Sequence, residues 1–223
     1  MIGRVARGLV VRACGALALA PSAALGQDAA TVLARAEEAY EEVTSLRASF
    51  VQVVDVPLLD RRREGRGTWY QKGASYFKMD FSDPEGDVLV ADGTYLWAFY
   101  PSQDPRQVVR STIDETRSDD RPADFHGRIL EDARSHYDSE LAGTERVAGV
   151  EAFLVVLSPT ERGRYQRVRI WIDTDTHLIR RFEFTELSET VRTIELSDIE
   201  LNAEIADAVF EFEPPPGVEV FEG

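Results

Sequence analysis

The sequence predicts a mainly β protein in which one strongly curved antiparallel sheet is accompanied by two helices. Two observations support this fold class. Short segments with alternating apolar and polar residues follow one another over most of the chain, as in strands that bury one face. Two other segments carry apolar residues at helical spacing, one before the first strand and one halfway along the series. Antiparallel strands in this number commonly roll into a barrel or half-barrel, which removes exposed edges.

The first predicted helix covers residues 28–44, and Asp28 is placed to cap its N-terminus. The second helix lies around residues 125–133. Gly127 destabilises this second helix by about 1 kcal/mol relative to alanine, so we expect it to be marginal. A short helical turn is expected at residues 203–208.

The strands form a meander in a single domain that covers residues 27–223, because the chain contains no repeat and no linker. Asp92-Gly93 is typical of a tight hairpin turn between two of the strands. The predicted strands are residues 46–54, 67–72, 76–81, 87–91, 95–100, 107–110, 138–141, 150–157, 165–172, 178–185 and 190–199.

Residues 1–26 have the composition of a secretory signal peptide. Three arginines and no acidic residue precede or flank a short apolar run at 13–20, which is too short to span a membrane. The small residues at 24–26 suit a signal peptidase, so we expect cleavage before Gln27 and a periplasmic mature chain.

Cys14 is the only cysteine, and it lies inside this apolar run rather than after it. This position does not suit lipid attachment. The mature chain then has no thiol for a disulfide or a nucleophile in an oxidising compartment. No later stretch approaches 18 uninterrupted apolar residues, so we expect a soluble exported protein.

The charge balance excludes nucleic acid as a partner. The chain has 25 basic and 40 acidic residues, a net charge of −15 and a pI near 4.7. Without the first 26 residues, 22 basic and 40 acidic residues remain, a net charge of −18. Such a chain repels polyanions and anionic membranes at long range. A hydrophobic content of 43% argues equally against disorder.

The sequence carries no recognisable catalytic or metal-binding motif: G-x-S-x-G, G-x-x-x-x-G-K and H-E-x-x-H are all missing. Residues 173–176, before His177, resemble a metal loop, but a hairpin turn is the simpler interpretation because Asp and Thr favour such turns. His126 and His136 are ten residues apart and do not share a helical face, so we interpret them as solvated helix residues. We therefore expect no enzyme, no metal and no cofactor.

Two further groups of residues leave alternatives open. Arg61, Arg62 and Arg63 indicate an exposed hairpin loop, with contact to a partner as the alternative. The chain also holds three tryptophans, eleven phenylalanines and seven tyrosines. They form either a plain core or the lining of a ligand cavity between a curved sheet and its helices. The two patterns look identical in a sequence, and a plain core is the simpler interpretation.

Five short motifs follow one another along nearly the whole mature chain. They are a strand with Phe50 and Gln52 two residues apart, the glycine-bearing residues 64–67, the apolar strand at 76–79, the Ala-Asp-Gly and Leu-Trp hairpin at 88–100, and the ending Phe-Glu-Phe-Glu-Pro-Pro-Pro-Gly-Val at 210–218. In this order and behind a signal peptide, they resemble the LolA family, the outer-membrane lipoprotein carrier proteins of the bacterial periplasm.

The resemblance implies an incomplete, unclosed antiparallel β-barrel covered by helices, whose hydrophobic interior takes the acyl chains of a lipoprotein. Such a carrier is expected to be a monomer. It accepts acylated lipoproteins from an inner-membrane lipoprotein-releasing transporter and passes them to an outer-membrane acceptor. The marginal second helix suits a lid over this interior.

Phe77 falls on a functional phenylalanine of the family. It shares a strand face with Met79 and Phe81, whereas Lys78 and Asp80 are expected on the opposite face, toward solvent. The residues expected to line the lipid-binding cavity are Phe50, Phe77, Met79, Leu89, Trp97, Ile129 and Leu130.

One departure from the family pattern concerns its arginine-proline pair, to which the latch between lid and barrel is attributed. Gly73-Ala74 stands at this place, and Lys72 is no substitute because its side chain should face the other way. The latch therefore has no counterpart here. The alternative function is a LolA-like periplasmic module that binds lipids or senses mislocalised lipoproteins without carrying them.

Overall fold

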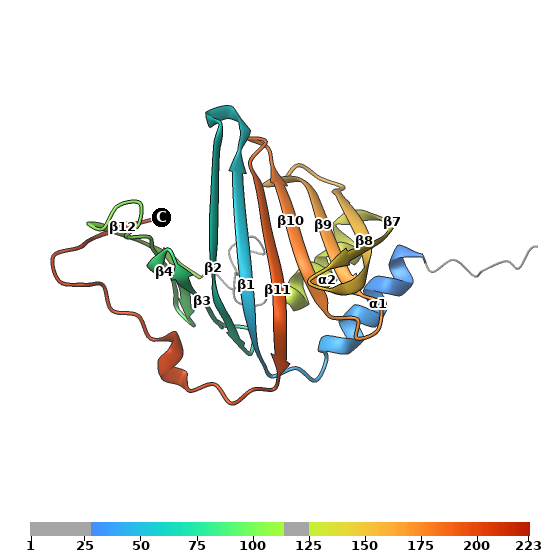
Figure 1. Cartoon of the computed structure of the whole chain (residues 1–223), viewed down its shortest axis with the longest axis horizontal. Coiled ribbons are helices and arrows are strands. Elements are labelled where there is room, and N and C mark those ends of the chain that lie inside the picture. The colour runs from blue at the N-terminus through green and yellow to red at the C-terminus, as the bar shows by residue number, and fades with distance from the viewer. Residues whose placement is uncertain (1–27, 114–124) are drawn as a thin grey trace, which may run out of the picture.

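The computed structural model describes residues 28–113 and 125–223. It contains one twelve-stranded sheet in the order β12-β6-β5-β4-β3-β2-β1-β11-β10-β9-β8-β7. Neighbouring strands are antiparallel except for β12 and β6, which are parallel. The sheet curls but its two edge strands do not pair with each other in the described residues (Figure 1). The predicted fold class, an unclosed curved sheet with helices, is thus confirmed.

The first strand, β1 (Ser45–Val56), joins the two halves of the sheet because it pairs with β2 (Arg61–Lys72) on one side and with β11 (Val191–Leu201) on the other. The half that follows β2 consists of β3 (Tyr76–Asp83), β4 (Glu85–Asp92), β5 (Tyr95–Phe99) and β6 (Gln107–Thr112). The half next to β11 consists of β10 (Ile179–Glu186), β9 (Tyr165–Asp173), β8 (Val150–Pro159) and β7 (Tyr137–Val147).

Both predicted helices are present. In α1 (Ala29–Tyr40), Asp28 caps the N-terminus, and its carboxylate accepts the Thr31 backbone N–H at 2.8 Å. The helix ends earlier than the predicted residue 44. The second helix, α2 (Phe125–Ser135), packs on α1 and on β7, at the right of Figure 1. The predicted signal peptide, residues 1–26 with Cys14, lies outside the described residues.

The chain after β11 crosses to the opposite end of the sheet, at the left of Figure 1. It forms the 3-10 helix η3 (Asp207–Phe210), close to the helical turn predicted at residues 203–208. It then adds β12 (Glu219–Glu222) in parallel to β6. The sequence did not predict β12, because a four-residue strand after a proline-rich segment has no pattern of its own and depends on a distant partner.

The strand β2 begins six residues before the predicted start at residue 67. Its first residues pair with the end of β1, with Arg61 opposite Val56 and Arg63 opposite Val54. The hairpin is closed by the short 3-10 helix η1 (Pro57–Leu59). Placing the arginines Arg61–Arg63 in a loop was therefore wrong, because backbone pairing continues beyond the apolar pattern, out to the exposed end of the hairpin.

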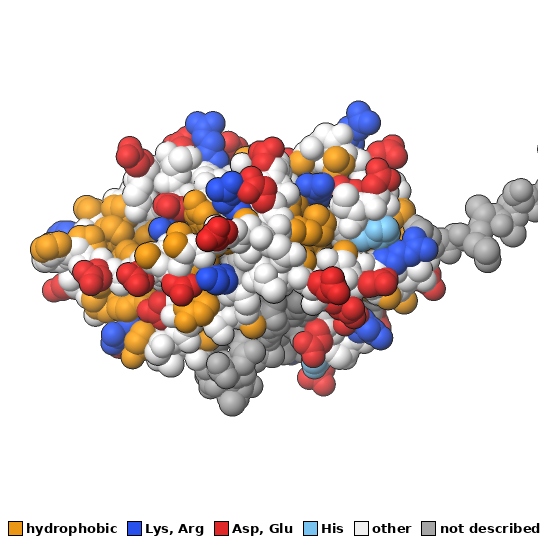
Figure 2. Space-filling view, turned by 90° about the horizontal axis from the view of Figure 1, so that it is seen from below, with side chains coloured by type: hydrophobic (Ala, Val, Ile, Leu, Met, Phe, Trp, Pro, Cys, Tyr) orange, Lys and Arg blue, Asp and Glu red, His pale blue; other side chains and the backbone are white. Residues whose placement is uncertain are grey.

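The two faces of the sheet carry separate apolar clusters. The face that α1 and α2 cover, here called the inner face, holds the main core, with residues from both helices and from most strands. On the opposite, outer face, a second cluster lies between β4, β5, β6 and the C-terminal segment. Acidic side chains are spread over the surface, and hydrophobic ones gather at the end of the molecule that carries the C-terminal segment (Figure 2).

Candidate functional site

The inner face brings together six of the seven residues predicted to line a lipid cavity. Phe50, Phe77, Met79 and Leu130 are each no more than 3% exposed and belong to the main core. Leu89 and Ile129 are partly buried and pack against the same core. Three strands and α2 therefore contribute to one apolar core.

The alternation of β3 fixes which side chains reach this surface. Phe77, Met79 and Phe81 are buried on the inner face, as predicted. Lys78 faces the other way, also as predicted, but only 20% of its side chain is exposed, and its ammonium lies 3.3 Å from the Asp80 carboxylate. The expectation that Lys78 points freely into solvent was therefore wrong, because the outer face of these strands is covered as well.

Aromatic rings give the inner face its shape. Trp69 and Phe77 are in edge contact at 4.6 Å between ring centroids, and Phe50 and Phe81 at 4.9 Å. Phe81 also meets Tyr100 at 6.2 Å. Phe50, Phe81 and Tyr100 thus form an aromatic path from the core toward the hairpin end of β1 and β2.

Two glycines of β2 make room for this path. A Cβ at Gly65 would lie 2.7 Å from the Phe81 ring, and a Cβ at Gly67 would lie 1.9 Å from the Asp80 carbonyl oxygen. Both distances are too short for a side chain, so only glycine lets β2 approach β3 in this way. The glycine-bearing motif at residues 64–67 thus has a packing role beside the site.

The prediction that Trp97 is a neighbour of Phe77 was wrong. Trp97 pairs with Val90 on the outer face, where its ring packs on Phe212 at 5.5 Å. The register of the hairpin between β4 and β5 is the signal that would have placed Trp97 correctly. Because Ala91 faces Leu96 across it, Leu89 and Trp97 belong to opposite faces of the sheet.

The outer cluster is held by polar contacts as well as by packing. The Asp92 carboxylate accepts hydrogen bonds from the backbone N–H groups of Thr94 and Tyr95 and from Trp97 Nε1, at 2.7–2.8 Å. Burial alone would raise the pKa of this carboxyl, but the three hydrogen bonds lower it below its ordinary value. The Lys72 ammonium bonds Asp207 at 2.6 Å and the Ile205 carbonyl at 3.0 Å, which ties the C-terminal segment to the sheet.

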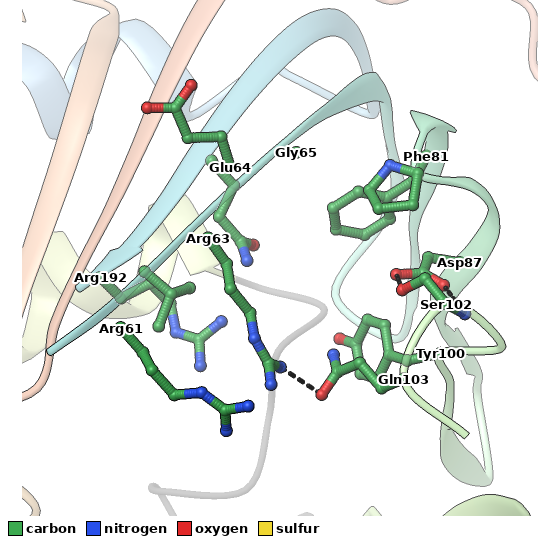
Figure 3. A pocket seen from close by; sticks show the side chains of 13 residues that line it. Arg61, Arg63, Glu64, Gly65, Phe81, Asp87, Tyr100, Ser102, Gln103 and Arg192 are labelled. Atoms are coloured by element: carbon green, nitrogen blue, oxygen red, sulfur yellow. Dashed lines mark hydrogen bonds between the residues drawn. The ribbon is translucent and has the colours of Figure 1, made fainter. Parts of the chain in front are cut away.

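A cavity of about 700 Å³ lies at the hairpin end of the inner face (Figure 3). Phe81 and Tyr100 form its apolar side, and burial raises the pKa of the Tyr100 phenol, which keeps it neutral. Its polar side is formed mainly by Arg61, Arg63 and Arg192. Sequence reasoning missed this cavity, because it depends on the register of β1 with β2 and β11.

The residues considered for metal binding have other surroundings. Asp173 ends β9, and its carboxylate accepts the backbone N–H groups of Asp175 and Thr176 and an Arg180 hydrogen bond at 2.8 Å. This confirms the predicted hairpin turn. His136 is exposed directly after α2, and the side chain of His126 lies outside what the structure describes. Within the described ranges, no three His, Cys, Asp or Glu side chains are grouped to hold a metal.

A curled, unclosed sheet with an apolar inner face, two helices and a cavity at the end of that face places the protein in the class of incomplete β-barrels. No helix in the described part of the chain is long and apolar enough to cross a membrane.

The family model described as outer membrane lipoprotein carrier protein LolA matches residues 41–213, and the chain belongs to this family. The chain is 27% identical over 223 residues to an outer-membrane lipoprotein carrier protein of Alkalilimnicola ehrlichii, a match that covers 98% of this chain and 95% of the relative. It is 26% identical over 182 residues to the protein of the same description in Haemophilus influenzae. This match covers 80% of this chain and 81% of the relative.

Among solved structures, an uncharacterized conserved protein from Thermus thermophilus has the same fold. The TM-score is 0.52 at 17% identity, and the match covers 86% of this chain and 97% of that one. The resemblance drawn from the five sequence motifs is therefore confirmed at the level of family and fold.

Proposed function

We propose that the protein is a periplasmic carrier that binds the acyl chains of lipoproteins on its inner face and moves them between the two membranes. The observation that carries this proposal is the assembly of Phe50, Phe77, Met79 and Leu89 of the sheet with Ile129 and Leu130 of α2 in one apolar core. Membership of the LolA family supports it. The described residues offer binding chemistry, and we assign no catalysis.

The energetics of transfer favour such a surface. Each buried methylene contributes about 0.8 kcal/mol, so exposing one sixteen-carbon chain to water costs on the order of 12 kcal/mol. A lipoprotein therefore crosses an aqueous compartment only with its chains covered. Transfer to an acceptor then requires an acceptor of higher affinity, because binding can shift the equilibrium only by a difference in affinity.

For acyl chains to bind the inner face, an element that covers it has to move away, and α2 is the element that suits this movement. Leu130 and Ala133 of α2 are buried against the core, so moving the helix away uncovers the surface beneath it. The helix is joined to α1 by a solvent-exposed ion pair between Arg134 and Glu37, an interaction of small net energy. In contrast, α1 is fixed to β10, since the Tyr40 hydroxyl accepts the Ile179 N–H at 3.0 Å.

The remaining parts of the proposal concern location and partners. Residues 1–26 act as the signal peptide, with cleavage before Gln27, and residues 27–223 are the mature, monomeric carrier domain. The cargo is an acylated lipoprotein. It is supplied by an inner-membrane lipoprotein-releasing transporter and received by an outer-membrane acceptor.

One observation favours a second function, a lipid-binding or lipoprotein-sensing module without carrier activity. Gly73 and Ala74 occupy the turn between β2 and β3 where the family has its arginine-proline pair. Lys72, beside them, is bound to the C-terminal segment on the outer face. No latch of the family type is therefore available at this turn.

Intact-mass analysis of the native protein separates the two functions. The full chain is expressed together with a lipoprotein, extracted gently and weighed with its ligand. The carrier function predicts a one-to-one complex with the acyl-modified lipoprotein. Free lipid alone would favour the second function, and an empty protein would contradict both.

A further inference from the structure

Three arginines share the inner face at the hairpin end of the sheet, where they surround one cavity (Figure 3). Val54 of β1 faces Arg63 of β2 on one side and Arg192 of β11 on the other. Arg61 lies two residues before Arg63 and so points to the same face. The two strands that flank β1 thus place three guanidinium groups around a single space, in a chain whose net charge is −15.

These arginines lack the acidic partners that their outer-face neighbours have. Within the described part of the chain, Arg61 and Arg192 form no ion pair or hydrogen bond, and Arg63 donates only to the side-chain oxygen of Gln103. On the outer side of the same strand, Arg62 pairs with Glu64 at 3.0 Å and Arg66 with Asp83 at 2.9 Å. The inner-face positive charge is therefore left uncompensated.

The two carboxylates of the cavity are already engaged. Asp87 is 4% exposed and accepts the Ser102 backbone N–H at 3.0 Å and the Ser102 hydroxyl at 2.6 Å. Glu64 is bound to Arg62, and in Figure 3 its carboxylate turns away from the arginines. Three positive and two negative side chains leave an excess of positive charge facing the cavity.

The cavity is also continuous with the apolar core. Phe81 lines it and touches Phe50, which is fully inside the core. Tyr100 lies on the same side, opposite the arginines in Figure 3. A ligand that fills the cavity and extends along Phe81 would need an anionic end and an apolar chain.

We propose that Arg61, Arg63 and Arg192 bind the phosphate of an anionic lipid whose acyl chain lies along Phe81 toward the core. The guanidinium fork matches the geometry of phosphate oxygens and forms charge-assisted hydrogen bonds with them. The inference rests on the proposed function in one respect, that acyl chains occupy the inner face. It adds a polar subsite, which selects anionic lipids over neutral ones of the same chain length.

The test is calorimetric titration of the purified protein, expressed as the full chain, with three probes. They are a sixteen-carbon lysophosphatidylglycerol, the uncharged monoacylglycerol with the same chain, both below their micellar concentrations, and inorganic phosphate. We expect the phospholipid to bind roughly ten-fold to a hundred-fold more tightly than the neutral lipid. The double variant Arg61→Gln/Arg192→Gln should lose this preference and keep its affinity for the neutral lipid.

The matched control is Arg66→Gln, on the same strand but on the outer face, which should bind all probes as the unmodified chain does. Equal affinity of the double variant and the unmodified protein for the phospholipid would overturn the inference and leave the proposed function standing. Inorganic phosphate binding as tightly as the phospholipid would also overturn it, because the ligand would then be free phosphate. Binding of neither lipid would contradict the proposed function as well.

Discussion

The two faces of the sheet around β3, β4 and β5 are both apolar and both covered, but their covers differ. On the inner face, Phe77 and Leu89 belong to the core to which both helices contribute apolar side chains. On the outer face, Trp97 lies under a C-terminal segment that is also fastened by Lys72 to Asp207 and by the strand β12. Apolarity alone therefore does not mark a binding face. A ligand can bind only the face whose covering element can move away.

The largest effect is expected from a charge on the inner face. Phe77→Glu places a carboxylate among buried side chains, at a cost of about 4 kcal/mol in the free energy of unfolding. We expect this variant to lose lipoprotein transfer while its circular dichroism still shows the sheet. Transfer is measured from the purified complex to acceptor-bearing membranes.

The matched control for this variant is Lys78→Glu, one residue away on the outer face. It breaks only the pair with Asp80 and should reduce stability by less than about 1 kcal/mol, with normal transfer. If Phe77→Glu transfers normally, or if Lys78→Glu is the more damaging change, the assignment of faces is incorrect.

The next effect concerns the close approach of β2 and β3 beside the inner face. Gly67→Ala forces a methyl group toward the Asp80 carbonyl and should lower the free energy of unfolding by about 3 kcal/mol. Gly163→Ala is the control, since nothing lies within 4 Å of a Cβ at that position. Urea unfolding measures both, and equal stability of the two variants would contradict the packing described for Gly67.

A change in the outer cluster should separate stability from binding. Phe212→Ala removes a half-buried ring that packs on Trp97 and Phe99, and should cost about 2 kcal/mol of unfolding free energy. Lipid affinity of the folded variant should stay unchanged, because no inner-face contact is lost. A parallel loss of lipid affinity would show that the two faces are not independent.

The smallest predicted effect is pH-dependent and also belongs to the outer face. The folded-state pKa of Asp92 is lowered, so its stabilising contribution is present at neutral pH and is lost as the pH falls through that pKa. Asp92→Asn should therefore reduce stability by about 1 kcal/mol at pH 7, and the difference should shrink below about pH 4. A difference that grows in acid would contradict the hydrogen-bond network around Trp97.

The sequence predicted the elements better than it predicted their faces. In β3, charged residues alternate with Phe77, Met79 and Phe81, so one face was unambiguous. In β4, both Leu89 and Val90 are apolar because both faces are covered, and alternation no longer distinguishes them. Only the register across the hairpin, which pairs Trp97 with Val90, places Trp97 on the outer face.

The arginine-lined cavity could not be predicted from local pattern at all. Arg61 and Arg63 alternate with the outer-face residues Arg62 and Glu64, so all four look like one charged run in the sequence. Arg192 is more than 100 positions away, and only the pairing of β1 with β11 brings it to them. Long-range register decides which charges meet, whereas sequence periodicity reports only neighbours.

Binding of the cargo by the inner face is tested most directly by comparing the two faces in one experiment. A photo-crosslinking amino acid replaces Leu89 on the inner face or Phe212 on the outer face, two partly buried positions, in cells that produce lipoproteins. After irradiation, we expect a covalent adduct with an acylated lipoprotein from position 89 and none from position 212. An adduct from position 212, or none from position 89 while the protein is folded, would contradict the claim that the inner face binds the cargo.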